Sequence, residues 1–81
     1  MGATHFFNEA HSLLTPMQIK LARTALGWGR KELAEASGVS RATIKRIEDG
    51  NRAFADTVDA LERTLRRHGC DFADDNWVKA P

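Results

Sequence analysis

The spacing of apolar residues predicts a first helix shortly after residue 14. Ile19, Ala22, Arg23 and Leu26 stand at positions i, i+3, i+4 and i+7, so they share one face of a helix. The preceding "TPMQ" offers a hydroxyl cap, a proline suited to the first helical position, and a glutamine that completes a capping box. Gly27 is expected to end this helix.

Two shorter helices are predicted next, with only about three residues between them. The first is "RKELAEAS", with Leu33 and Ala34 on its inward side and Gly38 after its end. The second has the body "RATIKRIED", with Ser40 as its cap and Gly50 as its stop. Two helices joined by "GVS" must turn sharply, and this is the spacing of a helix-turn-helix.

A fourth helix is predicted over about residues 57–68, followed by a short β-strand or hairpin. Val58, Leu61 and Leu65 form its buried stripe, and Asp56 is its expected cap. After this helix, "CDFADDNWV" places apolar residues on both sides of a polar "ADDN", which is typical of a strand or hairpin. A lone two-stranded ribbon is unstable, so it must pack on the helices or pair with a second chain.

These elements predict one small domain with an all-α core of four main helices and a short C-terminal β-strand or hairpin. Eighty-one residues allow one modest core, and a folded monomer of this size is only marginally stable, so oligomerisation is expected. We expect an N-terminal arm at residues 1–14, a helix-turn-helix domain at residues 15–69, and a C-terminal strand or tail at residues 70–81.

Charge is distributed unevenly along the chain, although the formal net charge is only +1. Residues 15–69 hold eleven Lys and Arg against seven Asp and Glu, whereas residues 70–81 hold three Asp and one Lys. The middle of the chain is therefore basic and its tail acidic. This distribution permits binding to a polyanion without requiring it, because helices of mixed charge are often simply solvated.

The third predicted helix separates its aliphatic residues from its basic ones. If Val39, Ile44 and Ile47 face the core, helix geometry turns the opposite side outward. That outer side consists of Arg41, Ala42, Lys45, Arg46 and Asp49. It is short, basic and nearly free of bulk, which suits a major groove about 12 Å wide, where arginine can bind guanine and alanine can touch a thymine methyl. The N-termini of the second and third helices add N–H donors for phosphates.

With these features, "LTPMQIKLARTALGWGRKELAEASGVSRATIKRIEDGNR" resembles the Cro/C1-type (XRE-like) helix-turn-helix proteins of bacteria and phages. The tail "TVDALERTLRRHGCDF" resembles that of their small single-domain members, and the likeness covers about residues 14–73. Its densest part is "ELAEASGVSRATIKRIEDG". The resemblance implies a lambda-repressor-like helical bundle and a sequence-specific DNA-binding transcriptional regulator, cytoplasmic and encoded by a bacterium or phage.

The resemblance also implies roles for individual residues. Residues 41–49 correspond to the recognition helix, with Arg41, Ala42 and Arg46 at base-reading positions. Arg30, Ser40, Asn51 and Arg52 match positions that contact phosphates in the family. Beyond the resemblance, we also expect Thr43 and Lys45 to contact the DNA backbone. Arg23 and Glu48 are expected to form a partly buried ion pair between the first and third helices. One departure from the family pattern is "WGRKELA", where Gly29 replaces a polar cap and Arg30 replaces a phosphate-binding glutamine.

We expect the protein to act as a homodimer on an inverted-repeat operator, most often as a repressor that blocks polymerase. Phe72, Trp77 and Val78, after the last helix, are the expected dimerisation residues. The alternative is a protein-interaction module, such as an anti-activator or antitoxin, that binds its partner through Phe6, Phe7, Phe72 and Trp77. The arm is open to three roles: a disordered segment, a DNA-reaching arm or a partner-binding segment.

Other kinds of chemistry find little support in the sequence. The single cysteine, Cys70, cannot form an internal disulfide, and His5, His11, His68 and Cys70 lack a recognised zinc spacing, so no metal or cofactor is expected. No nucleophile motif or glycine-rich phosphate loop is present, so we do not expect an enzyme. No apolar run approaches the roughly 20 residues of a membrane span, and the first residues lack the features of a secretory signal.

Overall fold

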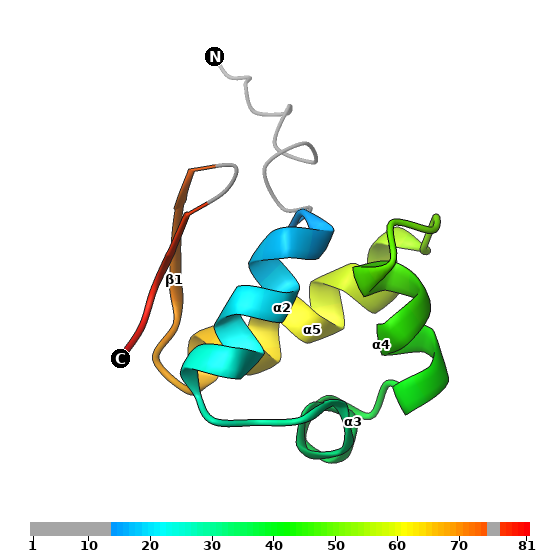
Figure 1. Cartoon of the computed structure of the whole chain (residues 1–81), viewed down its shortest axis with the longest axis horizontal. Coiled ribbons are helices and arrows are strands. Elements are labelled where there is room, and N and C mark those ends of the chain that lie inside the picture. Colours follow the sequence, from blue (N-terminus) through cyan, green and yellow to red (C-terminus); the bar gives the residue numbers. More distant parts are fainter. Residues whose placement is uncertain (1–13, 75–76) are drawn as a thin grey trace.

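The computed structural model describes residues 14–74 and 77–81, so the expected arm lies, apart from Leu14, outside the described residues. The described part consists of helices α2 (Pro16–Ala25), α3 (Arg30–Ser37), α4 (Arg41–Glu48) and α5 (Ala55–Arg67), and strands β1 (Asp71–Asp74) and β2 (Trp77–Lys79) (Figure 1). The two strands pair antiparallel in one small sheet. The predicted helical bundle with a short C-terminal hairpin is confirmed.

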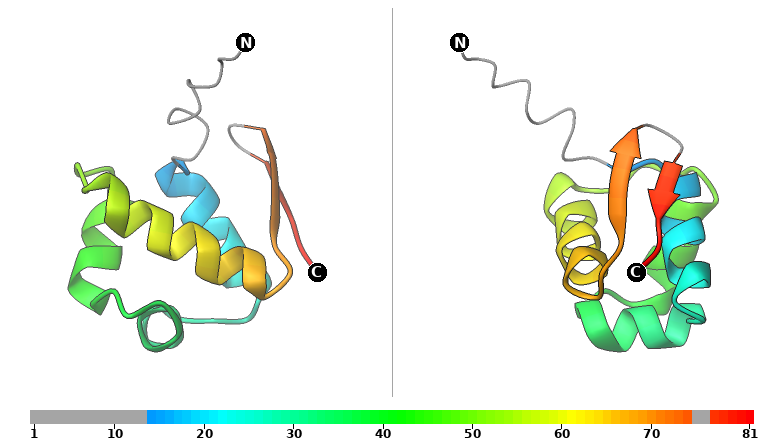
Figure 2. Two further views of the ribbon diagram at one scale, coloured as in Figure 1. Left: turned by 180° about the vertical axis from the view of Figure 1, so that it is seen from behind. Right: turned by 90° about the vertical axis from the view of Figure 1, so that its left-hand side faces the viewer.

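The helices enclose one core, and the hairpin covers it from the side. Helices α2 and α5 cross at the centre, α3 lies at one end, and α4 lies on the side away from the hairpin (Figures 1 and 2). Strand β2 runs beside α2. The hairpin is therefore a lid on the bundle, which resolves how a ribbon of two strands is stabilised within one chain.

Helix α2 begins at the capping box that the sequence predicts. The Thr15 hydroxyl accepts a hydrogen bond from the Gln18 N–H at 3.1 Å, and the Gln18 side-chain oxygen accepts one from the Thr15 N–H at 3.0 Å. Pro16 occupies the first helical position, where a missing N–H costs nothing. The helix ends at Ala25, with Leu26 as its C-cap and Gly27 next.

The turn between α3 and α4 has the sharp geometry that the sequence predicts. Gly38 ends α3 with φ of +82°, in the left-handed region that glycine enters without steric cost. Ser40 then caps α4, because its hydroxyl accepts a hydrogen bond from the Thr43 N–H at 3.1 Å. This turn sets the direction of α4 relative to α3.

The prediction for the start of α5 was wrong by two residues. The helix begins at Ala55 with Phe54 as its N-cap, and Asp56 lies in the first turn instead of capping it. The Phe54 carbonyl accepts hydrogen bonds from Thr57 N–H at 3.0 Å and Val58 N–H at 3.2 Å. A cap side chain is not needed here, because packing of the buried stripe holds the helix in place. The carboxylate of Asp56 still suits the positive end of the helix.

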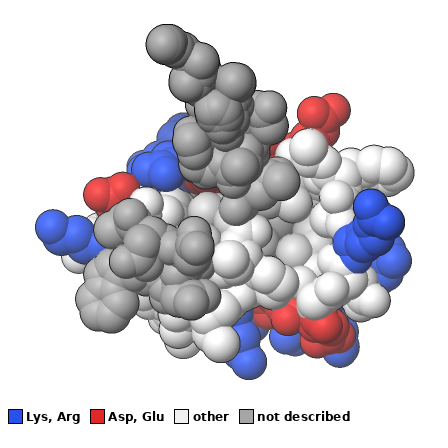
Figure 3. Space-filling view, turned by 90° about the horizontal axis from the view of Figure 1, so that it is seen from above, with Lys and Arg blue, Asp and Glu red and all other residues white. Residues whose placement is uncertain are grey.

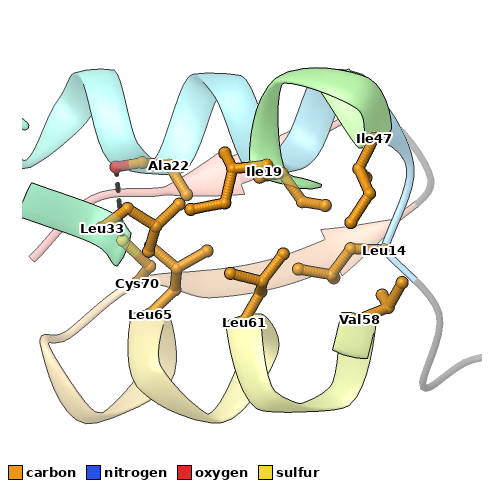
Figure 4. Close-up of a cluster of buried hydrophobic side chains, with 10 residues drawn as sticks. Leu14, Ile19, Ala22, Leu33, Ile47, Val58, Leu61, Leu65 and Cys70 are labelled. Atoms are coloured by element: carbon orange, nitrogen blue, oxygen red, sulfur yellow. Dashed lines mark hydrogen bonds between the residues drawn. The ribbon is translucent and has the colours of Figure 1, made fainter. Parts of the chain in front are cut away.

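The core draws on all four helices in the described chain (Figure 4). Its fully buried large residues are Ile19, Leu33, Ile44, Leu61 and Leu65. Leu14, Ala22, Ile47, Val58 and Cys70 complete it. The Cys70 thiol points at the Ala22 carbonyl at 3.8 Å, and burial raises its pKa. The predicted inward faces of α2, α3, α4 and α5 are therefore confirmed.

Leu61→Ala is expected to lower the free energy of unfolding by about 2–5 kcal/mol, because it leaves a cavity in the middle of this core. Leu21→Ala is the matched control: it removes the same atoms from a residue that is 42% exposed, so the loss should be much smaller. Urea unfolding followed by circular dichroism measures both. Equal losses for the two variants would contradict the central position of Leu61.

Candidate nucleic-acid interface

Helix α4 turns a basic side outward and an aliphatic side inward. Ile44 and Ile47 are buried, and Val39 packs partly buried against the same core. Arg41, Ala42, Lys45, Arg46 and Asp49 are all exposed, as the sequence predicts. Within residues 14–74 and 77–81, neither Arg41 nor Arg46 forms an ion pair, so both guanidinium groups are available to a ligand.

Lys45 differs from the two arginines because it has a partner on its own helix. Its ammonium group lies 2.7 Å from the Asp49 carboxylate, and both side chains are exposed. The hydrogen bond from Lys45 lowers the pKa of Asp49. Lys45 therefore offers a weaker local positive charge than Arg41 or Arg46, and an approaching anion would have to share it with Asp49.

Two of the predicted DNA-backbone residues also hold the ends of α4. The Ser40 hydroxyl accepts from the Thr43 N–H and donates to the Thr43 hydroxyl at 2.9 Å. The Asn51 side-chain amide donates to the Arg46 carbonyl at 3.1 Å, and the Asn51 N–H reaches the same oxygen at 3.0 Å. Arg52, in contrast, is exposed and forms no ion pair with the described residues.

A buried carboxylate joins three helices behind this surface. The side chain of Glu48 in α4 is 1% exposed and accepts two hydrogen bonds from Arg23 of α2, at 2.7 and 3.0 Å. This is the pair that the resemblance implies, and its hydrogen bond raises the pKa of Arg23. Arg23 also donates to the Trp28 carbonyl at 3.1 Å. Arg30 of α3 adds a further contact to Glu48 at 3.1 Å, which the sequence analysis missed.

Two open grooves flank the outer side of α4. The groove of about 550 Å³, here called the basic groove, is lined by Arg23, Gly29, Arg30, Lys31, Arg41, Ala42 and Lys45. The groove of about 490 Å³, here called the α4–α5 groove, is lined by Thr43, Arg46, Ile47, Arg52, Ala53, Phe54 and Thr57. Neither lining contains an acidic residue, so both grooves favour an anionic ligand.

The grooves bring together most of the residues singled out from the sequence. Arg30, Arg41, Ala42 and Lys45 line the basic groove, while Thr43, Arg46 and Arg52 line the α4–α5 groove. Phe54 was missed, although its sequence context carried a signal: in "NRAFADT" it is an aromatic residue outside every predicted apolar stripe.

Gly29 caps α3 without a side chain, and its N–H donates to Glu32 at 2.8 Å.

The two grooves concentrate positive charge beside α4. On the face from which α2 begins, the centre of the described surface carries no charged side chains, and acidic as well as basic side chains lie at its edges (Figure 3). Seven Lys and Arg line the two grooves around the start of α3 and along α4, while Arg63, Arg66 and Arg67 are exposed on α5. A concentrated patch of this kind is the footprint expected for binding one surface of a polyanion.

Aromatic residues elsewhere serve the packing of the chain. Trp28 packs partly buried against the core, with its ring edge-on to His68 at 4.7 Å between centroids. Phe72 and Val78 also pack partly buried against the core, and the Arg66 guanidinium lies 5.2 Å from the centre of the Phe72 ring. Phe6 and Phe7 and the side chain of Trp77 lie outside the described residues.

The described residues hold neither a metal-binding cluster nor a membrane-spanning helix. Across residues 14–74 and 77–81, no three His, Cys, Asp or Glu side chains are grouped so as to hold a metal ion. His5 and His11, two of the zinc ligands considered above, lie outside this part of the chain. None of the described helices combines the length and apolar character that crossing a membrane requires.

A family model described as a helix-turn-helix domain matches residues 17–75. The match begins in α2 and runs through β1, so it includes both grooves and the buried ion pairs. No curated protein and no solved structure matches the chain.

Glu48→Ala is expected to lower the free energy of unfolding by about 3 kcal/mol, because it leaves Arg23 buried without its partner. Asp49→Ala is the matched control, since it removes a neighbouring carboxylate whose ion pair is exposed, and its effect should be much smaller. Urea unfolding of both variants measures the difference. Similar effects would mean that Glu48 does not hold the helices together.

Proposed function

Because this chain belongs to the helix-turn-helix domain family, whose members are DNA-binding regulators, we propose that it is a sequence-specific transcriptional regulator. The single observation that carries the proposal is the arrangement of α4. Its aliphatic side is buried in the core, while Arg41 and Arg46 stand exposed and without ion-pair partners in the described chain. A helix presented in this way fits the major groove of a duplex.

In the proposed complex, α4 reads bases through its outer side. Arg41 and Arg46 bind guanine O6 and N7 in bidentate fashion, which is the commonest specific contact to DNA. Ala42 lies between them in the sequence, and its small side chain lets the helix approach closely enough to touch a thymine methyl. The exposure of all three residues supports this role.

The backbone contacts then hold α4 in register. Arg30 and Lys45 in the basic groove, and Thr43 and Arg52 in the α4–α5 groove, bind phosphates on the two sides of the helix. The side chains of Ser40 and Asn51 form hydrogen bonds at the two ends of α4. The contribution of Ser40 to phosphate binding therefore comes from the backbone N–H groups at the start of α4 that its cap leaves unpaired. The hydrogen bond that Arg30 donates to Glu48 limits the positions that the Arg30 guanidinium can take.

We further propose a homodimer on an inverted repeat, acting in the cytoplasm of a bacterium or of a phage-infected cell, and most often repressing by blocking polymerase. The hairpin supports this proposal, because a sheet of only two strands leaves backbone groups on its outer edges for a second copy. Phe72 and Val78, two of the three residues named from the sequence, are only partly buried by their own chain, so they keep apolar surface for such a contact.

Arg41→Ala is expected to weaken operator binding by about 1–3 kcal/mol and to relax the preference at one base pair. The operator is first selected from a pool of randomised duplexes, and fluorescence anisotropy then measures affinity for single-base variants. Arg67→Ala is the matched control, since it removes an exposed arginine from the far end of α5. A loss of equal size on every sequence would mean that Arg41 holds only phosphate, and failure to select any duplex would favour the protein-interaction alternative.

A dimer that places two copies of α4 in successive major grooves requires half-site centres about 10 base pairs apart or a multiple of that spacing. Inserting five base pairs between the half-sites turns one away from its helix, so affinity should fall to that of an isolated half-site. Anisotropy measures the loss, and analytical ultracentrifugation gives the mass of the bound protein. A monomer that binds both duplexes equally would contradict the dimer.

A further inference from the structure

The side chain of Phe54 is largely exposed, and packing within the described chain does not cover it. It is 84% exposed, more than Met17 at 54% or Leu21 at 42%, which are the other large apolar residues exposed within the described part of the chain. A phenyl ring in water forgoes the favourable free energy that burial would give it. Such a residue beside a proposed binding surface is a candidate for burial in the complex.

The backbone holds Phe54 in a defined place. Its extended conformation, with φ of −68° and ψ of 144°, caps α5, and its carbonyl accepts the Thr57 and Val58 N–H groups. Upstream, the two hydrogen bonds from Asn51 to the Arg46 carbonyl secure the start of the same connection. The ring therefore stands on an anchored segment at the rim of the α4–α5 groove, and little ordering is needed when a partner covers it.

The charges around Phe54 identify the partner that fits this groove. Arg46 and Arg52 line it together with the hydroxyl groups of Thr43 and Thr57, and its lining has no carboxylate. In a two-fold contact between copies of this chain, each patch meets itself, so these guanidinium groups would face their own equivalents without a counter-charge. A duplex supplies phosphates for the cations and apolar C–H groups for the ring.

We infer that Phe54 is an additional DNA contact, with its ring packed on a deoxyribose between phosphates that Arg52 and Thr43 bind; this inference rests on the proposed DNA-binding function. Two of the three proposed DNA contacts in the α4–α5 groove are backbone contacts, which places the ring at the sugar–phosphate strand beside the bases. Because every nucleotide presents the same sugar, Phe54 contributes affinity and register without sequence preference.

The test compares Phe54→Ala with Arg52→Ala on the selected operator and on an unrelated duplex, by anisotropy over a series of salt concentrations. Phe54→Ala should weaken binding about five- to tenfold, by the same factor on both duplexes, because an apolar contact to sugar is lost. Its slope of log affinity against log salt should stay unchanged, since no counterion is involved. Arg52→Ala should instead reduce that slope by about one. Phe54→Leu, which stays apolar, should recover part of the affinity.

Three results would overturn the inference while the proposed function stands. In the first, the parent binds its operator and Phe54→Ala binds both duplexes as tightly as the parent does. In the second, Phe54→Ala lowers the dimer fraction in ultracentrifugation. In the third, Phe54→Ala loses affinity for the operator alone, and replacing thymine by uracil in the operator causes the same loss for the parent. A parent protein that binds no duplex would remove the proposed function and this inference together. Because Phe54 is so exposed, an unchanged circular dichroism spectrum and melting temperature are expected and confirm that the variant folds.

Discussion

The buried carboxylate of Glu48 is the contact on which the arrangement of this molecule depends. With a side chain only 1% exposed, it carries a charge that the protein interior tolerates only when paired and hydrogen-bonded. Arg23 supplies two of its hydrogen bonds and Arg30 a third, so three helices meet at one anion. The pairing fixes how far α4 can rotate about its own axis, and that rotation decides which side chains reach solvent.

The consequences of that rotation extend over the whole candidate interface. With Ile44 and Ile47 turned into the core, Arg41 and Arg46 must point away from it, and each borders a different groove. Stability and presentation of the basic surface therefore rest on the same helix. The hairpin lies on the other side of the bundle and leaves this surface uncovered (Figure 2), so a second copy paired there and a duplex at α4 would not compete for space.

Much of this arrangement could be predicted because it depends on residues that are close together in the sequence. Apolar spacing identified the inward side of each helix, and the caps at Thr15 and Ser40 followed from side chains that reach a backbone N–H three residues on. The start of α5 was misplaced because the same rule favoured Asp56, whereas the helix begins two residues earlier, at Ala55, with only the backbone of Phe54 as its cap. The roles of the exposed residues in DNA binding, and the dimer, stay predictions.

By itself, the sequence determined the faces of the four helices in the described part of the chain, the sharp turn at Gly38, and the basic character of the outer side of α4, since each depends on neighbours within a turn or two. Only the tertiary structure decided that Arg30 joins Glu48, and that Phe54 stands exposed beside Arg46 and Arg52. Those relations depend on the angles at which separate helices pack, and packing is set by the filled core as a whole, not by any local run of residues.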